Sequence, residues 1–205
     1  MPLGDSYATL PQLKAYMRGS IEDDVTMYDS VLTDALASVS REIETHCNRQ
    51  FNSADSASAR SYGADEIFTL RDGATVRHWL AVDDFYDAAS LVVQSAGVTW
   101  SPSAFSLYPR NGVVSGQTGW PFYEICASGL TFDPADTSIT AKWGWTAAPA
   151  PVKQACLILA AETFQLKDAP FGVAGMDQFG VIRVRDNRMA ASKLAPYVRD
   201  PILVR

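Results

Sequence analysis

The chain of 205 residues has few of the residues that usually carry chemistry. It contains two histidines, His46 and His78, and three widely spaced cysteines, Cys47, Cys126 and Cys156. None of them stands in a zinc-binding spacing such as Cys-x-x-Cys or His-Glu-x-x-His. An odd number of isolated cysteines is typical of a reducing compartment. We therefore expect no metal, no cofactor and no disulfide framework.

Other sequence patterns are missing as well. There is no glycine-rich phosphate loop and no nucleophile elbow, so we expect no catalytic residues and a protein that is not an enzyme. The longest apolar run, ACLILAA, is far shorter than the roughly 20 residues of a membrane span. The first residues, MPLGDSYATL, do not form a signal peptide pattern. These features predict no membrane association.

The chain also lacks an excess of basic residues. It has 17 Lys and Arg against 23 Asp and Glu, a formal net charge of -6. Proteins that grip DNA usually carry a basic excess, because their affinity comes from neutralised phosphates. The signs are unevenly distributed, with acidic residues early and basic residues late. This pattern indicates either two solvated faces or head-to-tail contact between copies. For the second case the candidate subunit-interface residues are Asp23, Asp24, Asp29, Arg183 and Arg185.

Helical patterns occupy both ends of the chain. Residues 9–18 predict a short helix capped by Thr9 and ended by Gly19. A second helix is expected from Asp23 or Asp24 to about Gln50, with an apolar stripe at helical spacing and a length of about 39 Å at 1.5 Å per residue. After Pro149, a buried helix is expected to about Asp168. A short basic strand over 181–185 and a last helix from Asn187 to about Leu194 complete the C-terminal part.

The middle of the chain has a different character. From about residue 60, β-branched and aromatic residues occur in short runs between turns. The expected strands are 66–70, 77–81, 89–94, 98–100, 105–108 and 138–143, and the glycine-containing stretch 110–130 is expected to be mostly loop. The predicted fold class is α+β, a small helical bundle built from both chain ends with an inserted antiparallel β subdomain. The expected boundaries are 1–59, 60–147 and 148–205.

Three segments resemble the head–tail connector, or adaptor, proteins of tailed double-stranded DNA bacteriophages. The first is 7–51, with Tyr7, Thr9-Leu10, the acidic pair Asp23-Asp24 and an ending of Cys47, Arg49 and Phe51. The second is 139–164, where Gly144-Trp145 ends a strand and Pro149, Val152 and Ala155 enter a helix. The third is the ending Leu194-Ala195-Pro196-Tyr197. Compact members of that family lack an insertion as large as 60–138.

The resemblance implies a structural role in the virion neck, after synthesis in the host cytoplasm. Family members form a ring, usually of twelve copies, below the portal. The ring extends the DNA channel and joins the capsid to the tail. The implied partners are other copies of the chain, the portal protein, a stopper or tail protein, and DNA that passes through the lumen without specific binding. By the family's use of this end of the chain, the expected portal interface is Arg188, Lys193, Leu194, Tyr197 and Arg199.

Two alternatives remain open on the sequence. One is another neck or tail-completion protein of the same particle. The other belongs to a different class, a small ligand-binding domain or enzyme with a pocket lined by Trp79, Trp100 or Trp143 beside Asp83 and Asp84.

Overall fold

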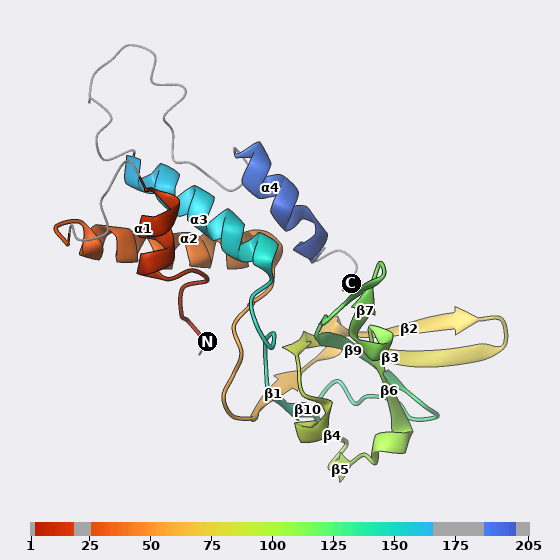
Figure 1. Cartoon of the computed structure of the whole chain (residues 1–205). Coiled ribbons are helices and arrows are strands. Elements are labelled where there is room, and N and C mark those ends of the chain that lie inside the picture. Colours follow the sequence, from red (N-terminus) through yellow and green to blue (C-terminus); the bar gives the residue numbers. More distant parts are fainter. Residues whose placement is uncertain (1–2, 19–25, 166–186, 200–205) are drawn as a thin grey trace. The chain divides into compact units, whose positions relative to one another are not determined.

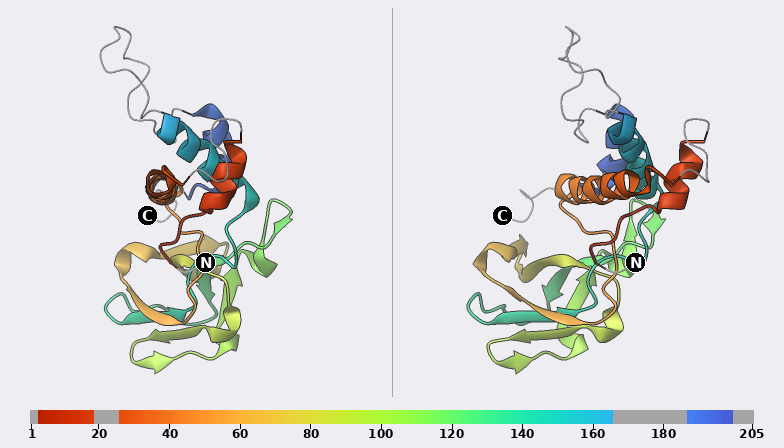
Figure 2. Two further views of the ribbon diagram at one scale, coloured as in Figure 1. Left: turned by 60° about the vertical axis from the view of Figure 1, so that its left-hand side comes forward. Right: turned by 90° about the vertical axis from the view of Figure 1, so that its left-hand side faces the viewer.

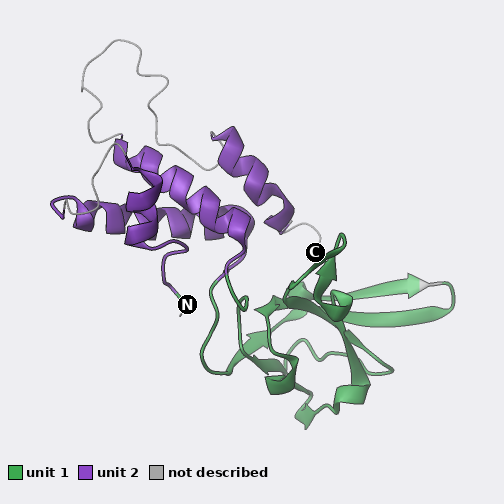
Figure 3. Ribbon diagram, viewed as in Figure 1, with its two compact units in different colours: residues 1–3, 52–147, 200–205 green, residues 4–51, 148–199 purple. Residues whose placement is uncertain are grey.

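A computed structural model gives the structure of the chain and describes residues 3–18, 26–165 and 187–199 (Figure 1). The chain divides into two compact units (Figure 3). Of the described residues, unit 1 contains Leu3 and 52–147, and unit 2 contains 4–18, 26–51, 148–165 and 187–199. The chain therefore leaves the helical unit after Phe51 and returns to it at Ala148.

Unit 2 is formed by helices from both ends of the chain. Its α-helices are α1 (Leu10–Tyr16), α2 (Asp29–Cys47), α3 (Ala150–Gln165) and α4 (Arg188–Leu194), and the 3-10 turn η7 (Ala195–Tyr197) follows α4. The helix α3 contacts each of the other three (Figures 1 and 2). Its buried residues lie around most of its circumference, including Val152, Cys156, Leu159 and Phe164. The C-terminal part of the chain thus supplies, in α3, the central helix of the bundle.

The first helix begins as the sequence predicts. The Thr9 hydroxyl accepts a hydrogen bond from the Gln12 backbone N–H, and the Gln12 side chain accepts one from the Thr9 N–H. This reciprocal pair is a capping box.

The long helix is shorter than predicted at both ends. It begins at Asp29, because residues 26–28 form a turn in which the Asp29 N–H donates to the Thr26 carbonyl. Tertiary contacts hold this start, since the Tyr28 ring packs edge-on against Phe164 with centroids 5.4 Å apart. The helix ends at Cys47 because Asn48 adopts a left-handed conformation, φ 49°, which asparagine tolerates well. Nineteen residues give a length of about 28 Å rather than 39 Å.

Unit 1 contains two four-stranded antiparallel sheets and a small hairpin. The first sheet has the order β1 (Ser58–Tyr62), β10 (Thr137–Ala141), β4 (Val92–Ser95) and β5 (Val98–Thr99). The second has the order β2 (Ile67–Asp72), β3 (Thr75–Phe85), β9 (Phe122–Ala127) and β6 (Phe105–Tyr108). The hairpin pairs β7 (Val113–Val114) with β8 (Gln117–Thr118). Short 3-10 turns connect them at Ala64–Glu66, Ala88–Ser90, Pro102–Ala104 and Arg110–Gly112.

Both sheets contribute to one hydrophobic core. Leu80 and Ile125 come from the second sheet, and Val93 and Ile139 come from the first. All four are fully buried. Two antiparallel sheets that share such a core form a β-sandwich-like layer pair. The arrangement confirms the predicted α+β class, with an antiparallel β region inserted between two helical segments.

Four strands, β1, β7, β8 and β9, have no counterpart in the sequence prediction. β9 lies in 110–130, which we expected to be mostly loop, yet it is a central strand between β3 and β6. No glycine lies between Gly119 and Gly129, and within this interval Ile125 and Ala127 alternate toward the core. β1 has the polar sequence SARSY and follows no strand pattern, because pairing with β10 at the sheet edge determines it. The expected start of a strand at Ala89 is instead a 3-10 turn capped by Asp87.

Candidate functional site

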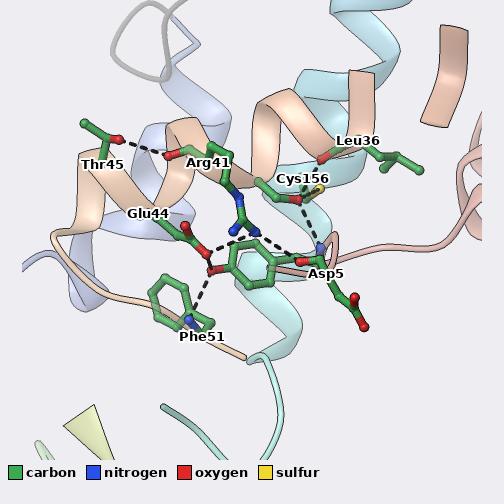
Figure 4. Close-up of polar contacts among 9 residues, drawn as sticks. Asp5, Leu36, Arg41, Glu44, Thr45, Phe51 and Cys156 are labelled. Atoms are coloured by element: carbon green, nitrogen blue, oxygen red, sulfur yellow. Dashed lines mark hydrogen bonds and ion pairs between the residues drawn. The ribbon is translucent and has the colours of Figure 1, made fainter. Parts of the chain in front are cut away.

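The start of the chain is attached to α2 and α3 by a buried polar cluster (Figure 4). The Tyr7 backbone N–H donates to the Ser40 hydroxyl at 3.0 Å, and that hydroxyl donates to the Leu36 carbonyl. The Ser40 Oγ also lies 3.6 Å from the Cys156 Sγ on α3. Because Ser40 and Tyr7 are buried, these bonds replace water and fix the position of the segment.

The Tyr7 phenol connects both ends of the first segment. It donates to Glu44 at 2.5 Å and accepts from the Phe51 backbone N–H at 3.1 Å. Arg41 pairs with Glu44 at 3.1 Å and donates to the Asp5 carbonyl. Burial, and then the hydrogen bond to the Glu44 carboxylate, raise the pKa of Tyr7 well above its usual value. The phenol therefore stays protonated and serves as a structural bridge, not as an acid.

The C-terminal segment joins the same core. Phe51 packs edge-on against Tyr7 at 5.6 Å and against Tyr197 at 5.9 Å. The Arg199 backbone N–H donates to the Cys47 carbonyl at 2.9 Å. Phe51 is fully buried between these two rings. The Phe51 side chain, just after α2, thus links the start of the chain with its C-terminal segment.

The expected portal-interface residues divide into core and surface. Leu194 is fully buried and Tyr197 nearly so, and both face the interior of unit 2. Arg188 is exposed, Arg199 is half-buried, and Lys193 is half-buried and donates to Gln154 at 2.8 Å. Met189, beside Arg188, is 64% exposed. The surface that α4 offers to a partner is therefore basic with one large apolar side chain.

Of the expected subunit-interface residues, the structure describes one. Asp29 lies in the first turn of α2 and pairs with Lys14 of the same chain at 2.6 Å. The Lys14 side chain is 8% exposed. A carboxylate at a helix N-terminus beside a buried ammonium has a role within unit 2. Asp23, Asp24, Arg183 and Arg185 lie outside the described residues, as does the expected strand 181–185.

The residues of the ligand-pocket alternative do not converge. Trp100 packs on Phe132 at 4.8 Å, and Trp143 packs on Phe85 within the core of unit 1. Asp83 is exposed and pairs with Arg60 at 2.5 Å. Asp84 is buried and accepts a 2.7 Å bond from the Trp145 indole. Consecutive residues of a strand point to opposite faces, so Asp83 and Asp84 on β3 do not face one common site.

The Gly144-Trp145 pair has a structural explanation. Gly144 has φ +92°, and a Cβ there would overlap the carbonyl oxygen of Asn52. The Gly144 N–H donates to the Asp84 carbonyl at 2.6 Å, and the Trp145 N–H donates to the Asn52 carbonyl at 3.0 Å. The two segments that connect the units, one leaving at 52 and one returning at 147, are thus held together backbone to backbone inside unit 1.

Within the described parts of the chain, no group of three or more His, Cys, Asp or Glu side chains is arranged to hold a metal ion. The histidines are separate, with His46 near the end of α2 and His78 on β3 beside Thr69. Among the same residues, no helix combines the length and apolar character that crossing a membrane requires.

The buried cysteines predict a loss of stability at alkaline pH. Burial raises the pKa of Cys47 from its ordinary value near 9 to about 12, and burial also raises the pKa of Cys156. Because the unfolded thiols ionise first, the stabilisation is complete below pH about 9 and is lost as the pH rises toward 12. We expect the urea midpoint of unit 2, followed by far-UV circular dichroism, to fall over this range. A midpoint that stays constant would contradict this assignment.

Comparison with known proteins gives similarity to solved structures alone. No protein-family model matches the chain, and no curated protein matches its sequence. A chain in the neck of an empty gene transfer agent particle, computed with C6 symmetry, is 18% identical with a TM-score of 0.47. A chain in the virion of a native gene transfer agent particle is 20% identical with a TM-score of 0.49. Each alignment covers 93% of this chain and 89% of the other. These values are below 25% identity and a TM-score of 0.5, and they assign no family to the chain.

Proposed function

We propose that this chain is a structural component of the neck of a tailed phage-like particle. In this role it is an adaptor that forms a ring, of twelve copies in the family it resembles, below the portal. The ring extends the DNA channel and joins the capsid to the tail. Its partners are other copies of itself, the portal protein, a stopper or tail protein, and the DNA that passes through.

One observation carries this proposal. The segments that resemble the adaptor family are distant in sequence. The described parts of 7–51, the helical part of 139–164, and 194–199 nevertheless all lie in unit 2. An aromatic contact joins two of these segments. Phe51, at the end of the first segment, packs against Tyr7 at its start and against Tyr197 in the third segment. Residues that resemble a family and also form one core are more informative than the same residues scattered over a surface.

Two buried polar pairs and the net charge agree with a passive role. Tyr7 with Glu44 and Asp84 with Trp145 form hydrogen bonds within the chain and serve structure. The net charge of -6 disfavours strong phosphate binding, which suits a channel through which DNA must slide.

The portal contact is proposed for the exposed basic surface of α4. In Arg188→Glu/Lys193→Glu, we expect loss of portal binding and of incorporation into particles with little change in stability, because Arg188 is exposed and Lys193 makes one surface hydrogen bond. The measurement is co-sedimentation with purified portal, followed by imaging of the complexes. Leu194 and Tyr197 are unsuitable for this test, since their substitution would disturb the core.

A matched control reverses the same number of charges elsewhere. Lys153→Glu/Arg110→Glu changes one half-buried lysine on α3 and one exposed arginine in unit 1. We expect this variant to bind portal as the unchanged chain does. Equal binding by both double variants would remove α4 as the portal contact, and an unchanged chain that never binds portal would contradict the proposed function.

A further inference from the structure

The strands β2 and β3 continue beyond the sheet that contains them. β3 begins to pair with β9 at His78, so its first three residues, Thr75–Arg77, pair with β2 alone among the described strands. We call residues 70–77 the arm. Figure 1 shows this hairpin extending past the other strands of its sheet. A two-stranded ribbon without further cover is marginally stable in water.

The side chains of the arm are unlike those of a solvated ribbon. Leu70 is 52% exposed and Val76 is 45% exposed. The strand register places Leu70 opposite Arg77 and Arg71 opposite Val76. Cross-strand partners share a face, so each face of the arm carries one aliphatic and one arginine side chain. Arginine is enriched at protein interfaces, and the exposed aliphatic side chains beside it offer apolar contact area.

The charge of the arm differs from that of the unit that carries it. The arm has two basic residues and one acidic residue, whereas the rest of 52–147 has three basic and nine acidic residues. The surface that complements the arm is therefore present on every other copy of the same chain. Complementary charges on different parts of one chain favour head-to-tail contact, which builds rings or filaments.

One part of unit 1 has the matching chemistry. The 3-10 turn Ala64–Glu66 follows β1, and the turn before β10 contains Asp133 and Asp136. The two turns are neighbours, because β1 pairs with β10 and Tyr62 lies opposite Thr137. Asp65 and Asp136 are exposed there. Leu130, in the loop that leads to the second turn, is 40% exposed. This acidic surface with an aliphatic residue mirrors the arm.

We propose that the arm of one copy docks on the acidic turns of unit 1 of the next copy. This inference rests on the proposed function for its biological setting, but its evidence is the register, exposure and charge of unit 1. Exposed Leu70 and Val76 favour a protein partner over DNA, because phosphate contact requires no apolar surface.

The test uses two variants of the full chain, one with a changed arm and one with a changed acidic surface. Arg71→Glu/Arg77→Glu removes the basic arm, and Asp65→Arg reverses the exposed carboxylate of the acidic surface. We expect each variant alone to self-associate at least tenfold more weakly than the unchanged chain in analytical ultracentrifugation, with portal and without it. Mixed together, the two variants should regain association. The unchanged arm of one meets the unchanged acidic surface of the other, and the reversed arm and the reversed turn also carry opposite charges.

A second variant removes the apolar side chains without changing charge. Leu70→Ser/Val76→Ser should also weaken self-association, and an unchanged melting temperature shows that the unit remains folded. Arg110→Glu, an exposed reversal outside the arm, is the control and should associate normally. The proposal would be overturned if the arm variants self-associated as strongly as the unchanged chain. It would also be overturned if they associated normally and particles containing them lost their DNA, or if the unchanged chain remained monomeric with and without portal.

The outcomes separate this inference from the proposed function. Arm-dependent self-association without portal binding would retain the arm contact and reject the adaptor role. Portal binding by a chain whose copies contact each other independently of the arm would retain the adaptor role and reject the arm contact.

Discussion

Gly144→Ala is expected to destabilise unit 1 by more than about 3 kcal/mol, because two penalties coincide. The backbone of Gly144 has φ +92°, a region that residues with a Cβ rarely adopt. The added Cβ would also overlap the carbonyl oxygen of Asn52, which is backbone and can only move with its chain. That movement would lengthen the hydrogen bond from the Trp145 N–H to the same oxygen.

Gly129→Ala is the matched control for this prediction. Gly129 also has a positive φ, +76°, but nothing lies within 4 Å of a Cβ built there. We expect it to cost about 1 kcal/mol, the backbone part alone. The difference between the two variants measures the close approach of the connecting segments.

Tryptophan fluorescence measures the unfolding of unit 1 selectively. All five tryptophans, at 79, 100, 120, 143 and 145, belong to unit 1. Urea unfolding followed by their emission therefore measures the unit in which Gly144 lies. Equal losses for Gly144→Ala and Gly129→Ala would show that the contact with Asn52 has no energetic weight.

Phe51→Ala is expected to cost unit 2 about 3–5 kcal/mol, the range for a large aromatic removed from a packed core. Phe51 is fully buried and contacts both Tyr7 and Tyr197. Its loss leaves a cavity where three segments of the chain meet. Because a small domain is stable by about 5–15 kcal/mol, this loss should also reduce or abolish the assembly that the proposed function requires.

Far-UV circular dichroism follows this second prediction, since the long helices belong to unit 2. Phe51→Leu is the control, because it keeps most of the volume and should cost about 1.5 kcal/mol or less. If Phe51→Ala unfolds at the same urea concentration as the unchanged chain, the aromatic junction does not hold the segments together. Retention of stability with loss of assembly would instead show that the aromatic junction affects assembly without determining the stability of unit 2.

Local patterns in the sequence predicted much of the helical unit. The Thr9 cap and the apolar stripe of α2 depend on neighbours three or four residues away, and both are observed. Proline near the start and a buried pattern likewise predicted α3. The prediction was wrong at both ends of α2. Its early end is local, since Asn48 adopts a left-handed conformation, whereas its start at Asp29 has long-range contacts with Phe164 and Lys14.

The β unit depended less on local patterns. β1 is polar and carries no strand signal, and the alternating pattern of β9 is short and follows a stretch with several glycines. Their strand character comes from pairing with β10, β3 and β6, which are remote in sequence. The arm has the same origin, since only the register shows that β2 and β3 extend past β9.

By itself, the sequence determined the class of the fold, the helices at both ends, the isolation of its cysteines and histidines, and a net negative charge. Tertiary structure alone decided which residues meet. It placed Tyr7, Phe51 and Tyr197 in one core, turned Asp83 outward and Asp84 inward, and brought Gly144 against Asn52. The physical reason is that caps and periodicity act over a few residues, whereas burial and backbone approach are set by segments separated by much of the chain.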